Sequence, residues 1–202
     1  MSGIAILGWL AALTATLLGV PQAVRLWRTR DTDGLSLVAW QFMLVLNLTW
    51  TSHGMLIGQL NMVLPNALAV TSTLPVLVLV SRDRGLQLWR VLLPPLAGTL
   101  LLIGVDLSLG SAVFGTISLV PAIGANAGQS VDLVRAPAVS GVSPVFLAWQ
   151  LVNQSLWGTW ALLVPDPGAL ICAVATGLVA VFNVAWWLAR RFGLRALFAT
   201  AS

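Results

Sequence analysis

Seven apolar stretches follow one another along the chain, separated by short polar segments. They cover residues 3–24, 35–58, 62–80, 91–109, 112–131, 142–164 and 168–189. A transmembrane helix needs about 20 predominantly apolar residues. The pattern therefore predicts an all-α membrane protein with seven transmembrane helices. We expect the first stretch to remain as a span rather than to be a cleaved signal, because it is longer than a signal core and no basic residue precedes it.

The basic residues test this count, because they fall into connections on one side of the seven predicted spans. They are Arg25, Arg28, Arg30, Arg82, Arg84, Arg90, Arg135, Arg190, Arg191 and Arg195. Cytoplasmic connections are enriched in Lys and Arg. We therefore expect a multi-pass protein of the plasma membrane, with its N-terminus outside and its C-terminus cytoplasmic. Removing any interior span would scatter the arginines to both faces.

Composition agrees with this interpretation and excludes several classes of protein. The chain is 58% hydrophobic and only 8% charged, whereas soluble domains carry about 25% charged residues. The net charge of +4 comes from the arginines that mark the cytoplasmic connections. We therefore expect no nucleic-acid partner. One cysteine and one histidine exclude an internal disulfide and give no metal cluster or catalytic triad. We expect no enzyme activity, no metal and no cofactor.

The chain also carries an internal repeat at a shift of 107 residues. Four pairs of identical residues coincide at this shift: Gln22 and Gln129, Gly34 and Gly141, Ser36 and Ser143, and Trp50 and Trp157. Internal repeats in membrane proteins are typical of transporters that bind substrate between the two halves. The repeat favours a transporter over a single bundle of unrelated helices.

Each predicted unit has three spans, so two directly joined units would point in opposite directions. The fourth span restores the orientation and makes the units parallel. We predict a first three-helix repeat over residues 1–80, a linker helix over 81–110, a second three-helix repeat over 111–191 and a cytoplasmic tail over 192–202. The fold class is thus two parallel three-helix bundles joined by a linker helix, or 3+1+3.

These motifs resemble the PQ-loop superfamily, and the 3+1+3 layout resembles its SWEET-type sugar transporters. In the first unit the matching residues are Pro21, Gln22, Gly34, Ser36, Trp50, Gly54 and Asn66, with His53 where the family has Tyr. In the second unit Gly128 replaces the proline and Ala173 replaces the asparagine. The resemblance implies a membrane transporter that works by alternating access.

The repeated motif also predicts hinge and gate positions. Pro21 breaks the hydrogen-bond ladder of the first helix, and the adjacent Gln22 can satisfy a freed backbone group. In the second unit, Gly128 offers backbone freedom for a different reason, beside Gln129. Pro144 resembles a further gate proline of the family. A static kink is the alternative at Pro21.

The resemblance places Trp50 and Asn66 in a central pocket, and the repeat adds Trp157. An indole face can stack on a sugar ring, and an amide can both donate to and accept from hydroxyl groups. Asn47, Gln154 and Ala173 complete the predicted pocket. Because Ala173 replaces the second asparagine of the family pattern, Asn66 is the one asparagine that remains from that pair. Ordinary helix packing for the tryptophans and an interhelical hydrogen bond for Asn66 remain open alternatives.

The leading hypothesis is facilitated, bidirectional (uniport) transport of a small neutral solute, with mono- or disaccharides favoured. A proton-coupled carrier needs a titratable group within the membrane, and Asp106 is the acid expected within a span, while Asp106 and Asp132 are the candidate acidic contacts for a cationic solute. For His53 we expect a hydrogen bond rather than titration. The alternatives are an amino-acid or cationic-solute carrier and a non-transporting receptor. The partners are a small-molecule substrate and the lipid bilayer, and a homo-oligomer stays open because one chain holds both repeats.

Overall fold

The fold is entirely helical over the part of the chain that the structure describes. This computed structural model describes residues 2–30, 32, 35–136, 139, 142–195 and 197, apart from the side chains of 18–27, 29 and 127. The helices are α1 (Gly3–Thr29), α2 (Leu37–Leu56), α3 (Leu60–Asp83), α4 (Leu88–Leu109), α5 (Ser111–Arg135), α6 (Pro144–Leu163) and α7 (Pro167–Arg191). They occupy the seven stretches that the apolar pattern predicts.

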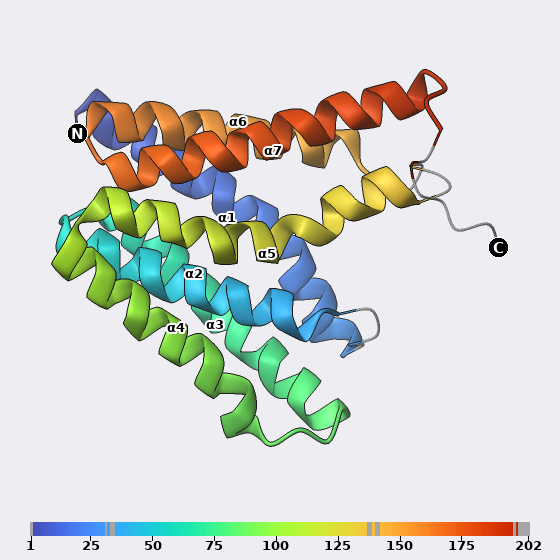
Figure 1. Cartoon of the computed structure of the whole chain (residues 1–202), viewed down its shortest axis with the longest axis horizontal. Helices are drawn as coiled ribbons and strands as arrows, with labels where there is room; N and C mark the ends of the chain where they lie inside the picture. Colours follow the sequence, from blue (N-terminus) through green and yellow to red (C-terminus); the bar gives the residue numbers. More distant parts are fainter. Residues whose placement is uncertain are drawn as a thin grey trace.

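The helices fall into two packed groups with α4 on one side (Figure 1). In the first group α3 packs against both α1 and α2, and in the second α7 packs against both α5 and α6. Between the groups, α1 packs on α6 and α2 packs on α5. Helix α4 contacts α2, α3 and α5. The first helix of each group thus contacts the second helix of the other group, as expected for two similar units that face each other.

Serine caps start the second helix of each group. The side chain of Ser36 accepts a hydrogen bond from the backbone N–H of Ala39 at 3.2 Å, and Ser143 accepts from that of Phe146 at 3.3 Å. A serine at this position satisfies one of the free N–H groups at a helix start. The repeated serine of the motif therefore sets where α2 and α6 begin.

The seams between the groups are also made by matching positions. Phe42 of α2 lies against Gly124 of α5, where any added Cβ would collide with the Phe42 ring. At the same place in the repeat, the indole N–H of Trp149 in α6 donates to the carbonyl of Thr14 in α1 at 3.0 Å. Each second helix thus presents an aromatic ring to the first helix of the other group.

Not every helix is apolar enough to cross a membrane by itself. Over the described residues, α3, α4 and α7 meet a length and hydropathy criterion for a span, and α5 adds a fourth if its two bent segments are taken together. This supports a multi-pass membrane protein, and a crossing by all seven helices stays a prediction. Helices α2 and α6 do not qualify, and both carry several amide side chains that lower their hydropathy.

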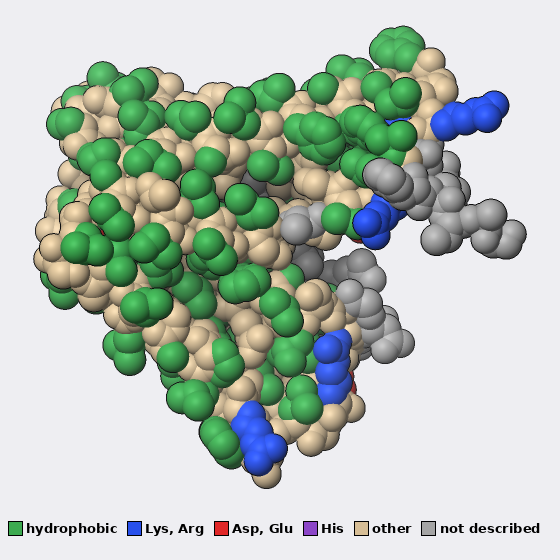
Figure 2. Space-filling model, viewed as in Figure 1, with side chains coloured by type: hydrophobic (Ala, Val, Ile, Leu, Met, Phe, Trp, Pro, Cys, Tyr) green, Lys and Arg blue, Asp and Glu red, His purple; other side chains and the backbone are tan. Residues whose placement is uncertain are grey.

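Arginines lie toward one end of the molecule. On the face shown in Figure 2 they appear at the right and at the bottom, away from the end where α4 meets α5. Arg190, near the end of α7, donates to the backbone carbonyls of Leu133 and Ala136 at 3.1 and 2.7 Å. The end that carries the arginines is called the basic end below, and the opposite end, where α2, α4 and α6 finish, is called the outer end.

Packing inside the second group depends on Gly115. A Cβ at Gly115 would collide with the backbone of Gly168 in α7, whereas a Cβ at Gly104 in α4 would meet nothing within 4 Å. Gly115→Ala should therefore lower the melting temperature in detergent, since overpacking costs about 1–3 kcal/mol. Gly104→Ala should leave it unchanged or raise it, because alanine favours a helix over glycine. Equal melting temperatures for the two variants would contradict this packing.

Candidate functional site

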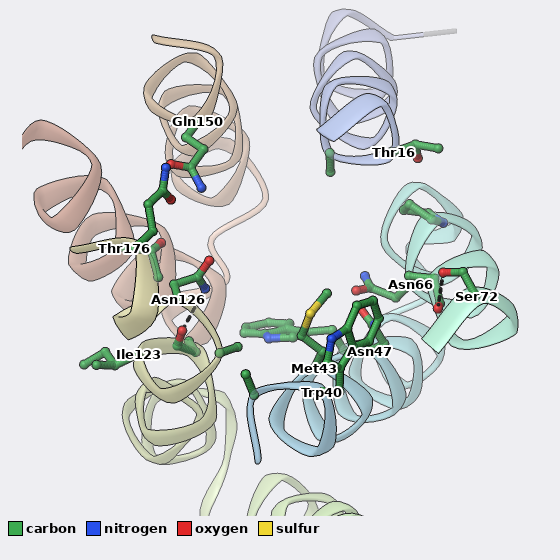
Figure 3. A pocket seen from close by; sticks show the side chains of 18 of the residues that line it. Thr16, Trp40, Met43, Asn47, Asn66, Ser72, Ile123, Asn126, Gln150 and Thr176 are labelled. Carbon is green, nitrogen blue, oxygen red and sulfur yellow. Dashed lines mark hydrogen bonds between the residues drawn. The ribbon is translucent and has the colours of Figure 1, made fainter. Parts of the chain in front are cut away.

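A large cavity lies between the two groups of helices. It has a volume of about 1900 Å³ and runs from Arg30 and Arg82 at the basic end to Trp50 and Trp157 deep in the protein. Typical ligand pockets are about 300–1,000 Å³, so the larger size fits a pocket joined to an open mouth. Figure 3 shows side chains of α1, α2, α3, α5, α6 and α7 around it. Among the described lining residues, none comes from α4.

All six residues predicted to bind substrate lie on the wall of this cavity. They are Trp50, Asn66, Trp157, Asn47, Gln154 and Ala173. Ala173 is buried and only 5% exposed, so it adds little surface. Their role in binding stays a prediction, but the structure brings them together from both groups.

The two tryptophans lie where the cavity ends. The Trp50 ring makes edge contacts with Phe114 and His53, with centroids 5.0 and 5.5 Å apart. The Trp157 ring makes a perpendicular contact with Trp160 at 5.5 Å. Each indole is therefore held by a second aromatic ring, which restricts its orientation.

The predicted amides keep hydrogen-bonding capacity for a ligand. Asn66 uses its N–H to donate to the carbonyl of Met62, one turn earlier in α3, at 2.8 Å. Gln154 uses its oxygen to accept from Thr176 at 2.8 Å. These contacts leave the oxygen of Asn66 and the N–H₂ group of Gln154 without partners among the described residues. One acceptor and one donor thus remain on opposite walls.

The wall also carries amides that are absent from the sequence prediction, among them Asn126 and Gln150. Asn126 of α5 donates to the carbonyl of Ala122 at 2.8 Å and leaves its oxygen for a ligand, and Gln150 of α6 also lines the cavity (Figure 3). At the repeat shift, these positions correspond to Gly19 and Met43, so the duplication gives no signal for them. The second group therefore has amides on the wall despite Ala173.

The charge of the cavity is confined to its mouth. Among the described lining residues the charged side chains are Arg30 and Arg82, and no Asp or Glu is present. An uncharged wall of indoles and amides suits a neutral solute with hydroxyl groups. A cationic solute would leave its charge without an acidic partner there.

The predicted hinge residues are only partly visible. Pro21 and Gln22 belong to α1, but their side chains lie outside the described residues. In the second group, the segments Ser111–Asn126 and Gly128–Arg135 of α5 meet at an angle of 49°, beside Gln129, which lines the cavity. Pro144 starts α6 directly after its Ser143 cap. Motion at these positions stays a prediction.

Comparison with known proteins confirms the resemblance drawn from the sequence. Residues 3–56 match the family model described as a PQ loop repeat. The solved structure of a eukaryotic SWEET transporter superposes with a TM-score of 0.73 at 14% sequence identity, over 95% of this chain and 100% of that one. The chain carries a PQ-loop repeat and folds like a SWEET transporter. A search of curated proteins finds no match.

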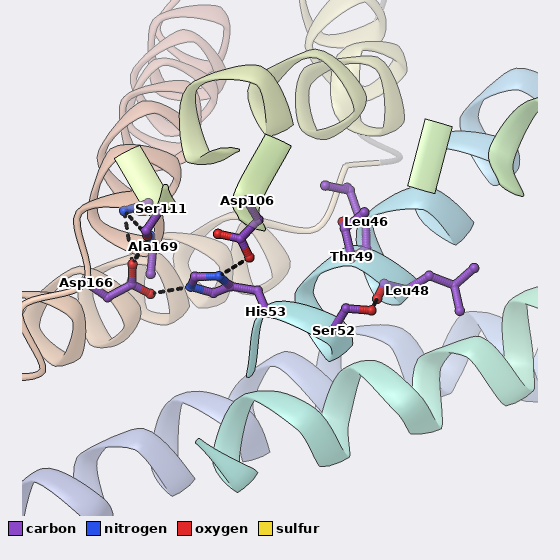
Figure 4. Close-up of polar contacts among 10 residues, drawn as sticks. Leu46, Leu48, Thr49, Ser52, His53, Asp106, Ser111, Asp166 and Ala169 are labelled. Atoms are coloured by element: carbon purple, nitrogen blue, oxygen red, sulfur yellow. Dashed lines mark hydrogen bonds and ion pairs between the residues drawn. The ribbon is translucent and has the colours of Figure 1, made fainter. Parts of the chain in front are cut away.

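The structure has a buried acid–base cluster at its outer end (Figure 4). The Nδ1 atom of His53 lies 2.7 Å from Oδ2 of Asp106, and its Nε2 atom lies 3.0 Å from Oδ2 of Asp166. The three side chains are 1%, 7% and 4% exposed, respectively. The cluster joins α2, α4 and the connection between α6 and α7.

Asp166 has a second role as the cap of α7. Its other carboxylate oxygen accepts from the hydroxyl of Ser111 and from the backbone N–H of Gly168, the latter at 3.0 Å. Burial alone would raise the pKa of Asp166, but hydrogen bonds from His53 and Ser111 hold that pKa below its usual range. Ser111 faces this carboxylate and not the imidazole, so His53 is not placed to activate it as a nucleophile.

A second contact closes the outer end on the opposite side. Trp160 of α6 is fully buried, and it lies with Asn61 of α3 so close to Gly8 of α1 that a Cβ there would collide with both. The cavity thus opens at the basic end and is closed at the outer end, where the His53 cluster and Trp160 pack.

We predicted a hydrogen bond for His53, and the structure shows that its ring contacts both Asp106 and Asp166. The sequence did not reveal these partners, because the three residues lie far apart along the chain and meet only through packing of the helices.

The sole cysteine reports on the direction of the opening. Cys172 lines the cavity and is partly exposed. A membrane-impermeant maleimide should react with it faster from the basic end, measured by mass shift in inside-out and right-side-out vesicles. Cys172→Ser should show no labelling from either side. Faster labelling from the outer end would contradict the direction of opening described here.

Proposed function

We propose that this protein is a membrane transporter for a small neutral solute, with mono- or disaccharides as the favoured class. The proposed mode is facilitated, bidirectional uniport by alternating access. The observation that carries the proposal is the cavity between the two groups: it is lined by six helices, open at one end and closed beyond a pair of tryptophans at the other.

The same observation supports the 3+1+3 architecture as part of the proposal. Helix α4 supplies none of the described lining residues, as expected for a linker that only restores orientation. Residues 1–80 and 111–191 would then be the two parallel repeats, residues 81–110 the linker and 192–202 the tail. The basic end would face the cytoplasm of a plasma-membrane protein, which places the N-terminus outside.

The chemistry of the wall favours a polyol. Trp50 and Trp157 offer apolar faces from both repeats, and the amide groups of Asn66 and Gln154 offer one acceptor and one donor. A sugar presents apolar C–H faces together with hydroxyl groups that both donate and accept. An amino acid would bring two charges, and the described wall carries only Arg30 and Arg82, both at the mouth.

The rival on this fold is a proton-coupled carrier of amino acids or cations. The observation in its favour is the buried pair of acids, Asp106 and Asp166, around His53. None of these three residues lines the cavity, so the cluster does not supply a counter-charge for a bound cation. We therefore place the rival second.

Binding by Asn66 can be tested without disturbing the packing, because its side chain bonds within its own helix among the described residues. Asn66→Leu should weaken the affinity for the bound sugar by about fivefold, since one hydrogen bond contributes about 1 kcal/mol. Calorimetric titration of the purified protein with glucose and sucrose measures the effect. Gln87→Leu, outside this cavity, is the control and should bind as the wild type does.

Two outcomes would count against the proposal. An unchanged affinity for Asn66→Leu would remove Asn66 from the binding site. Binding of amino acids, with no binding of either sugar, would favour the rival carrier.

A further inference from the structure

The His53 cluster is a contact between parts of the chain that must separate if the outer end opens. His53 belongs to the first repeat, Asp106 to the linker helix, and Asp166 to the second repeat. One small ring therefore contacts all three segments at the outer end (Figure 4). Because the ring is 1% exposed in this arrangement, its contacts form only while the outer end is closed.

The geometry also fixes how many protons the cluster needs. Each ring nitrogen lies within hydrogen-bond distance of the carboxylate of a different aspartate. An ionised carboxylate can only accept, so it bonds to a ring nitrogen only if that nitrogen carries a proton. A neutral imidazole has one N–H and can donate to one of the two. Both contacts require one additional proton, carried either by the ring or by one of the acids. The count is the same in either case, because the three groups titrate together.

We propose that His53, Asp106 and Asp166 form a proton-binding site that holds the outer end closed while this additional proton is bound. When the proton leaves, a bare ring nitrogen faces a carboxylate oxygen, and the cluster carries two negative charges in a buried place. Burial of unpaired charge is unfavourable, so the segments separate. The proposal rests on the proposed alternating access, since opening of the outer end is one of its steps.

The surroundings of His53 limit the titration to this cluster. From α4 it faces Asp106, and from the connection before α7 it faces Asp166. Helix α5 contributes the Phe114 ring, stacked on the imidazole at 4.9 Å, and α2 itself contributes Trp50. Among the described contacts of His53, the two aspartates are thus the titratable groups.

The aromatic neighbours also separate the site from the cavity. Trp50 lines the cavity, whereas His53, Asp106 and Asp166 do not, and the Trp50 ring lies edge-on to the imidazole. In the closed arrangement the proton has no route into the cavity among the described residues. It exchanges with the outer medium when the outer end opens. The site therefore senses external pH and does not carry protons along with the substrate.

Of the two contacts that close the outer end, only the one at His53 contains titratable groups among the described residues. At the repeat shift, His53 corresponds to Trp160, and Asp166 corresponds to Gln59. The described side chains that lie against Gly8 in the other seam, those of Trp160 and Asn61, are not titratable. The pH response should thus come from the seam between α2 and the second repeat alone.

The sign of the response follows from the proton count. The closed form binds one proton more than the open form, so acid favours closure and alkali favours opening. For one linked proton, the ratio of open to closed molecules rises by up to about tenfold per pH unit. Below the range in which the open form also takes up this proton, the ratio becomes constant.

Spin labels on the two sides of the outer end measure this ratio directly. Leu60, at the start of α3, and Leu163, at the end of α6, are 63% and 50% exposed. The substitutions Leu60→Cys and Leu163→Cys, made together in a Cys172→Ala background, allow pulsed electron paramagnetic resonance in liposomes from pH 5 to pH 9. We expect a short distance at acid pH and a growing long-distance population as pH rises.

Asp106→Asn is the decisive variant. The amide can donate to Nδ1 of a neutral imidazole while Nε2–H donates to Asp166, so closure no longer needs the additional proton. The short distance should then persist over the whole range. In His53→Gln the distance distribution should also be independent of pH. Asp132→Asn is the control: Asp132 is exposed near the basic end, and this variant should respond as the wild type does.

Any of three results would overturn the proposal. The first is a wild-type distance distribution that does not change between pH 5 and pH 9. The second is an unaltered pH response in Asp106→Asn or His53→Gln. The third is substrate-driven proton movement, detected with a pH dye trapped in the liposomes. The distance measurements use no substrate, so their failure is distinguishable from failure of the proposed transport, which the sugar titration tests.

Discussion

Polar side chains in an otherwise apolar chain must be kept out of lipid, and the arrangement of the helices depends on this constraint. Helices α2 and α6 carry amides and a histidine, and neither has the composition of a lone span. Packing α2 on α5 and α6 on α1 places these side chains against protein. Two facing groups of three helices hide the polar groups and at the same time create a cavity that can receive a polar solute.

Equivalent positions in the two groups have the same role at the start of the second helix and different roles at the outer end. Ser36 and Ser143 both cap a second helix, so the duplicated motif does the same work twice. At the outer end the equivalence is lost, since His53 makes ionic contacts where Trp160 makes an apolar one. One seam is thus sensitive to protonation and the other is not. The duplicated helices form the two similar walls of the cavity, and the unlike residues at the outer end make only one of its two closing contacts dependent on protonation.

The sequence predicts most of the fold and part of the site. The seven apolar stretches place all seven helices, because a helix that lies in lipid or packs on other helices needs apolar residues along most of its length. The repeat and the family resemblance bring Trp50 and Trp157 to one cavity. Asn126 is missed, because its counterpart in the repeat is Gly19. The contact between His53 and Asp166 is missed because it joins the two groups across a seam, and such contacts depend on packing that a single sequence does not encode locally.

The central claim is that a solute-binding cavity opens to alternate ends of the molecule. Counterflow in proteoliposomes tests it most directly, because exchange through one alternating site needs no ion gradient. Vesicles preloaded with unlabelled glucose or sucrose should transiently accumulate the same labelled sugar above its external concentration. Absence of this overshoot for both sugars and for a panel of other neutral solutes, in protein shown to be folded, would contradict the account.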